Sequence, residues 1–144
     1  EPSQTAGRPM LDVLLGAEVH NICVVVTRYF GGTLLGTGGL VRAYSGAVQE
    51  GLSNSTIVEK CLGRQLDITT DYTGIGKIQY ILAQNQIITL DTQYTDKVQV
   101  SAMVPQEKLD SIVAEITEGT SGRAELLEGD PVYYGLLDGE IVVF

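Results

Sequence analysis

The residues of this sequence best suited to binding chemistry are concentrated in one glycine-rich stretch. Five of the 17 glycines fall between positions 31 and 39: Gly31, Gly32, Gly36, Gly38 and Gly39. The β-branched residues 24–30 before them predict a buried strand, and apolar residues at helical spacing from Leu40 onward predict a helix. The glycines therefore join a strand to a helix.

Two interpretations of this junction stay open. Amide groups at a helix N-terminus carry partial positive charge, and Arg28 and Arg42 could add full charges beside them, which favours anion binding. The alternative is a tight crossover packed under a neighbouring strand, since glycine tolerates a close approach of other backbone. No known phosphate fingerprint decides between them. Gly31 and Gly36 have P-loop spacing, but Thr37 stands where the lysine belongs.

Polar residues also gather at the beginning of the chain. Residues 5–15 read as a helix that Gly16 ends, with Glu1, Ser3, Thr5 and Arg8 at or just before its start. Ser3 or Thr5 could cap this helix. Alternatively, Gln4, Thr5 and Arg8 could line one cleft together with the glycine loop. The candidate anion- or partner-binding residues are Glu1, Ser3, Thr5, Arg8, Arg28, Tyr29, Gly31, Gly32, Gly36, Gly38, Gly39 and Arg42.

The remaining composition points to no catalytic chemistry. His20 is the only histidine, and no cysteine, serine or acid stands at a recognisable partner spacing, so we predict no catalytic set, metal site or cofactor. The net charge is −9, of which residues 57–144 carry −8. Such an acidic half argues against non-specific nucleic-acid binding, and no DNA partner is expected. No apolar run is long enough for a membrane helix, so we expect a cytoplasmic protein without a membrane partner.

The elements predict an α+β protein of two domains, residues 1–58 and 59–144. The second half shows the order β-α-β-β-α-β, with a helix over residues 77–85 and a hairpin of strands over 87–94 and 97–104. That order is the split-βαβ arrangement of ferredoxin-like domains. The first half, with two helices and one strand, is too small to stand alone. The absence of an initiator methionine leads us to expect a fragment or processed form.

Two motifs resemble those of the IMPACT family, in particular its bacterial members. They are residues 1–11, Glu-Pro-Ser-Gln-Thr-Ala-Gly-Arg-Pro-Met-Leu, and the pair formed by residues 26–32 and 35–45. Gln4 replaces the usual glycine of the family, and Leu35 replaces a lysine found in many members. The resemblance implies two α/β sandwich domains: the first, incomplete here, like domain IV of elongation factor G, and the second ferredoxin-like.

The resemblance also implies a function. Eukaryotic IMPACT proteins inhibit starvation signalling to the initiation-factor kinase, so we expect a translation-linked regulatory or interaction protein. Its expected partners are RNA, the ribosome or a translation-regulatory protein. The alternative is an enzyme that acts on a small phosphorylated or nucleotide substrate at the glycine-rich loop.

Overall fold

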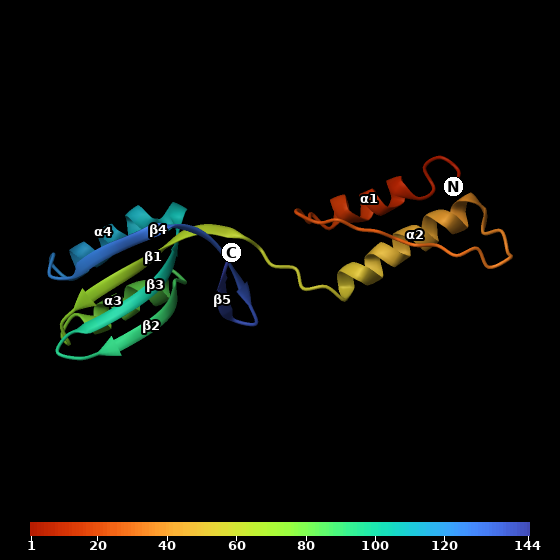
Figure 1. The fold of residues 1–144 in the computed structure, drawn as a ribbon. Helices are drawn as coiled ribbons and strands as arrows, with labels where there is room; N and C mark the ends of the chain where they lie inside the picture. The colour runs from red at the N-terminus through yellow and green to blue at the C-terminus, as the bar shows by residue number, and fades with distance from the viewer. The chain divides into compact units, whose positions relative to one another are not determined.

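The apolar spacing after Pro9 and after Gly39 produces two helices in the computed structural model, which describes residues 1–144 (Figure 1). They are α1 (Gly7–Gly16) and α2 (Gly36–Ser53), and they belong to the first of two units, Glu1–Ile57 and Val58–Phe144. Pro9 of α1 is buried in this unit. Leu40, Tyr44 and Val48 of α2, spaced four apart, form its buried stripe.

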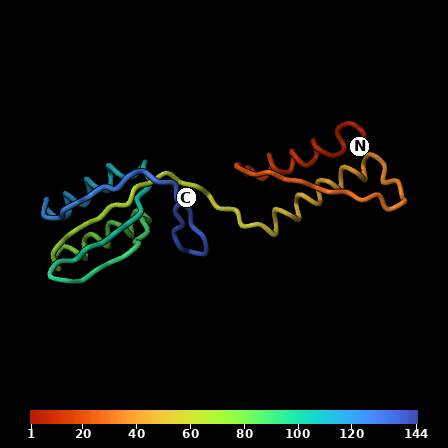
Figure 2. Tube along the Cα trace, viewed as in Figure 1, coloured from red at the N-terminus to blue at the C-terminus, as the bar shows by residue number.

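The predicted strand over residues 24–30 is not formed. Figure 1 draws neither a helix nor a strand arrow between α1 and α2, and Figure 2 follows this segment along its Cα trace. The backbone of residues 20–34 makes no hydrogen bond to other backbone groups. Its side chains still alternate: Val24, Val26 and Arg28 are half-buried, whereas Val25 and Tyr29 are 83% and 89% exposed. The expected α/β sandwich of the first domain is therefore wrong for this unit. A strand needs a neighbouring strand for its N–H and C=O groups, and residues 1–57 contain no other one.

Helix capping by Ser3 or Thr5 is also wrong. The residue before α1 is Ala6, and no side chain caps this end. The Thr5 hydroxyl instead donates to the Pro2 carbonyl, and Thr5 is buried. Thr5 thus stabilises the turn that precedes the helix.

The second unit is a five-stranded antiparallel sheet with two helices. Along the chain it contains β1 (Cys61–Thr70), α3 (Ile75–Gln84), β2 (Ile88–Tyr94), β3 (Val98–Pro105), a 3-10 turn η1 (Gln106–Lys108), α4 (Leu109–Gly119), β4 (Glu125–Leu137) and β5 (Glu140–Val143). The strand order is β2-β3-β1-β4-β5. Because β3 lies between β1 and β2, the first four strands have the split-βαβ arrangement. The predicted element order is confirmed, and β5 extends it through a hairpin with β4.

One face of this sheet carries the core. Leu66 and Ile68 of β1 alternate with polar neighbours and pack with Val98, Val100, Ala102 and Val104 of β3. Helices α3 and α4 cover this face with Ile78, Ile81, Leu82, Ile112 and Ile116 (Figure 1). The helix predicted over residues 77–85 corresponds to α3. No helix of the structure has the length and apolar character needed to cross a membrane.

Candidate anion-binding site at the start of α2

The glycine-rich stretch leads directly into the first turn of α2. Gly32 and Gly36 have φ angles of +87° and +74°, which are conformations that other residues rarely adopt. Gly36 is the first residue of α2, and the preceding Leu35 provides no side-chain cap. The first turn holds no acidic residue. Its amide groups therefore have no side-chain acceptor, and they add to the positive end of the helix dipole.

The guanidinium of Arg42 lies over this first turn. A Cβ atom at Gly38 would be 3.3 Å from Nη1 of Arg42, and one at Gly39 would be 4.0 Å from Nη2. Arg42 itself is exposed and forms no ion pair. The absence of side chains at positions 38 and 39 thus lets a full positive charge lie beside the helix terminus. This arrangement can accept a phosphate or carboxylate group.

Arg28 is committed to a different contact. Its Nη1 donates to the carboxylate of Glu1, which also accepts a hydrogen bond of 3.3 Å from the Tyr44 hydroxyl. The Arg28 guanidinium lowers the pKa of the Glu1 carboxyl below its usual value. Glu1 therefore neutralises Arg28 and ties the start of the chain to α2. Arg28 also lies 5.9 Å from the centre of the Phe30 ring.

The other candidate residues lie elsewhere in the first unit. Arg8 forms an ion pair of 2.9 Å with Asp12, one helical turn further along α1. Gln4 and Arg8 do line a common cleft of about 610 Å³, with Asp12, Ser45 and Gln49, but none of the loop glycines lines it. Ser3 and Tyr29 are exposed, as are Gly31 and Gly32, whereas Thr5 is buried.

The structure thus forms two separate groups from the candidate residues. In the first group Glu1 pairs with Arg28, and in the second the guanidinium of Arg42 lies beside Gly38 and Gly39. Sequence reasoning missed Tyr44, the buried partner of Glu1. The helical spacing of Tyr44 indicated only a core position, and its contact with Glu1 joins residues that are 43 positions apart in the sequence.

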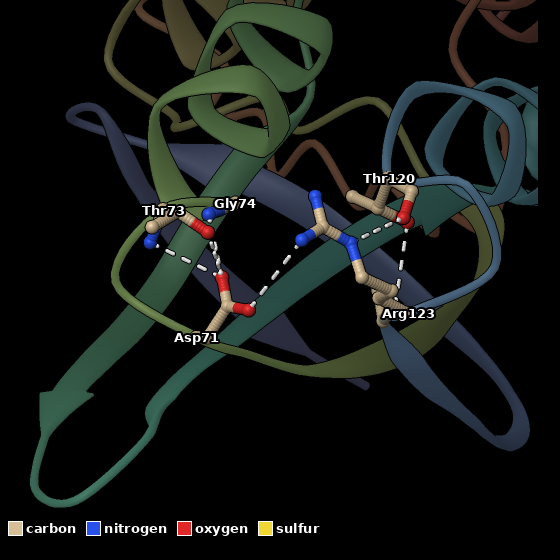
Figure 3. Close-up of polar contacts among 6 residues, drawn as sticks. Asp71, Thr73, Gly74, Thr120 and Arg123 are labelled. Carbon is tan, nitrogen blue, oxygen red and sulfur yellow. Dashed lines mark hydrogen bonds and ion pairs between the residues drawn. The ribbon is translucent and has the colours of Figure 1, made fainter.

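A further polar cluster begins α3 in the second unit (Figure 3). Asp71 accepts hydrogen bonds from the Thr73 hydroxyl at 2.7 Å and from the Gly74 amide at 2.8 Å. These hydrogen bonds lower the pKa of Asp71. Arg123 lies 4.0 Å from the same carboxylate and donates to the Thr120 carbonyl. Every polar group here has a partner within the unit, so we assign this cluster to structure.

Comparison with known proteins agrees with the two-part organisation. Residues 1–52 match the Impact N-terminal domain, and residues 68–123 match a domain of unknown function, DUF1949. The class is therefore an α+β protein that combines these two domains. The chain belongs to the IMPACT family.

Individual relatives show the same similarity. The chain is 41% identical over 133 residues to the IMPACT family member YvyE of Bacillus subtilis, a match that covers 92% of this chain and 61% of YvyE. It is 35% identical over 127 residues to the IMPACT family member YigZ of Escherichia coli, covering 88% of this chain and 62% of YigZ. A crystal structure of a hypothetical protein matches at 35% identity and a TM-score of 0.48, over 88% of this chain and 62% of that one. The chain thus spans about three fifths of the length of these relatives.

Proposed function

We propose that this chain is a translation-linked interaction protein that binds RNA phosphates at the start of α2. The link to translation rests on the family resemblance. The binding role rests on one observation: the Arg42 guanidinium lies over Gly38 and Gly39 and has no carboxylate partner. A phosphate there would receive charge-assisted hydrogen bonds from Arg42 and from the free amides of the helix.

The charges of the first unit support this assignment. It holds three arginines, of which Arg8 is paired with Asp12 and Arg28 with Glu1. Arg42 is the one arginine left for an external anion. The unit is close to neutral, at −1, whereas residues 58–144 carry −8. An anionic partner is therefore repelled less by the first unit than by the second.

The loop geometry favours binding over catalysis. The carboxylate of Glu1, which contacts α2 at Tyr44, is occupied by Arg28 and Tyr44. Its lowered pKa suits an ion pair and not a general base near neutral pH. His20 and Cys23 are exposed on the extended segment and have no hydrogen-bond partner. We therefore place RNA before a small phosphorylated substrate.

The test compares Arg42→Ala with Arg8→Ala in the full chain. A fluorescein-labelled single-stranded oligoribonucleotide is titrated with each variant, and thermal melting is measured in parallel. Arg42→Ala should weaken RNA binding about tenfold, because a hydrogen bond to a charged group typically contributes about 1.5–3 kcal/mol. It should also reduce the salt dependence, since one phosphate contact is lost. Arg8→Ala removes an equal charge from an exposed pair and should leave binding nearly unchanged.

Other outcomes assign other roles. Equal weakening by both variants would mean that RNA responds only to net charge. A lower melting temperature of Arg42→Ala with unchanged binding would make Arg42 structural. Stabilisation of the chain by ATP or GTP, without RNA binding, would instead support the alternative function, an enzyme that acts on a nucleotide substrate.

A further inference from the structure

The sheet of the second unit has one face on which neither α3 nor α4 packs. These helices pack on the opposite face, over the apolar cluster that contains Leu66 and Ile68 of β1. The face without helices is hollowed into a cavity of about 540 Å³ whose lining comes from β1, β2, β3 and β4. This surface, which we call the open face, belongs to the second unit, whereas the start of α2 belongs to the first.

Strand register places the side chains of the open face in two rows. In one row, Asp91 of β2 faces Ser101 of β3, which faces Asp67 of β1, which faces Leu127 of β4. In the next row the order is Gln93, Gln99, Thr69 and Glu125. All eight line the cavity. Since adjacent strands lie about 4.8 Å apart, Asp67 and Asp91 are about 10 Å from each other across the sheet.

The charges on these rows all have one sign. Asp67, Asp91 and Glu125 line the cavity, no lysine or arginine does, and none of the three forms an ion pair. Asp67 accepts hydrogen bonds only from neutral groups, Ser101 at 2.7 Å and Gln65 at 3.0 Å. The carboxylates therefore keep their negative charge uncompensated within the chain.

The remaining lining distinguishes between partners. No aromatic side chain lines the cavity, so the cavity offers no surface on which a nucleobase could stack, and its carboxylates repel phosphates. Leu127, which is 68% exposed, provides an apolar surface beside Asp67. Lysine and arginine combine an aliphatic stem with a charged head and can cover such a surface while reaching the carboxylates.

We propose that the open face docks an extended, basic protein segment. Same-side residues of an extended chain are about 7 Å apart, so lysines at alternate positions can reach carboxylates in both rows. The glutamine side chains of the second row can hydrogen-bond the backbone of the segment. The partner is identified by charge complementarity: the face is acidic, and the unit that carries it has a net charge of −8.

The experiment titrates the full chain into a fluorescein-labelled octapeptide of alternating lysine and threonine at low ionic strength. The open-face variant carries Asp67→Asn, Asp91→Asn and Glu125→Gln. The control variant removes the same number of charges from exposed positions outside the cavity, with Asp110→Asn, Glu118→Gln and Glu140→Gln. We expect about a tenfold loss of affinity for the open-face variant and less than about a twofold loss for the control.

Three results would overturn the proposal. The first is an equal loss of affinity in both variants, which indicates general attraction between net charges. The second is no binding of the peptide by the unmodified chain. The third is tighter binding of the RNA oligonucleotide than of the peptide at the open face. Arg42→Ala should bind the peptide as the unmodified chain does. The open face and the RNA site can therefore fail independently.

Discussion

Nη1 of Arg42 lies so close to Gly38 that a Cβ atom at this position would be 3.3 Å from it. That distance is shorter than an ordinary van der Waals contact, so the flexible side chain of Arg42 would have to move. A glycine at the start of α2 thus makes room for a guanidinium that is four residues further along the same helix. A substitution of Gly38 is therefore expected to change the stability of the chain and its affinity for RNA in opposite directions.

Gly38→Ala is expected to weaken RNA binding about threefold while raising the melting temperature. Alanine displaces Arg42 from the first turn, but alanine in a helix is about 0.5–1 kcal/mol more favourable than glycine. The control is Gly46→Ala in the same helix, where an added Cβ has no atom within 4 Å. Gly46→Ala should raise the melting temperature and leave binding unchanged. A Gly38→Ala variant that binds RNA normally would separate Arg42 from the proposed site.

Asp71→Asn should lower the stability of the second unit at neutral pH and have no effect in strong acid. The hydrogen bonds from Thr73 and Gly74 depress the folded-state pKa of Asp71, so its contribution is present above the unfolded pKa of about 3.9. It is lost as the pH falls through the folded pKa. The melting temperatures of the unmodified chain and of the Asp71→Asn variant are measured from neutral pH to strong acid, and the difference between them should disappear on acidification. Asp130→Asn, at an exposed carboxylate without hydrogen bonds, should show no such difference.

Gly63→Ala should destabilise the second unit by about 1–3 kcal/mol. An added Cβ in β1 would lie 2.7 Å from the Val104 carbonyl oxygen and 2.6 Å from Cε1 of Tyr134. The carbonyl belongs to the paired strand β3 and cannot move without disturbing the sheet. Gly76→Ala is the matched control, because its Cβ has open space on the exposed side of α3. Denaturant unfolding should show opposite signs for the two variants, and equal stabilities would contradict the steric argument.

The second unit could be predicted in detail because its signals are local. Alternation in β1 and β3 and the helical spacing of Ile78, Ile81 and Leu82 each place side chains on one side of one element. The order of the elements then followed from the sequence. The open face could not be predicted, since the facing of Asp67 with Leu127 and of Asp91 with Ser101 depends on register between distant strands.

The structure of the first unit depends on long-range contacts that local sequence patterns do not indicate. Valines at 24–26 favour an extended backbone, and the backbone is extended, but strand formation depends on a partner elsewhere in space. The approach of Arg42 to Gly38 agrees with helical spacing of four residues. The pairing of Glu1 with Arg28 spans 27 residues, and no periodicity indicates such a contact.

The extended segment between α1 and α2 also affects how the chain behaves at high concentration. Residues 22–27, Ile-Cys-Val-Val-Val-Thr, contain no charge, proline or glycine, and their amide and carbonyl groups have no backbone partner. These properties are the sequence signature of segments that stack into cross-β fibrils. Arg28 directly follows the run, in the position of a charged gatekeeper, but its charge is neutralised by Glu1. Because Arg28 lowers the pKa of Glu1, only strong acid protonates Glu1 and frees that charge, so any decrease in fibril formation through this contact should appear only in strong acid.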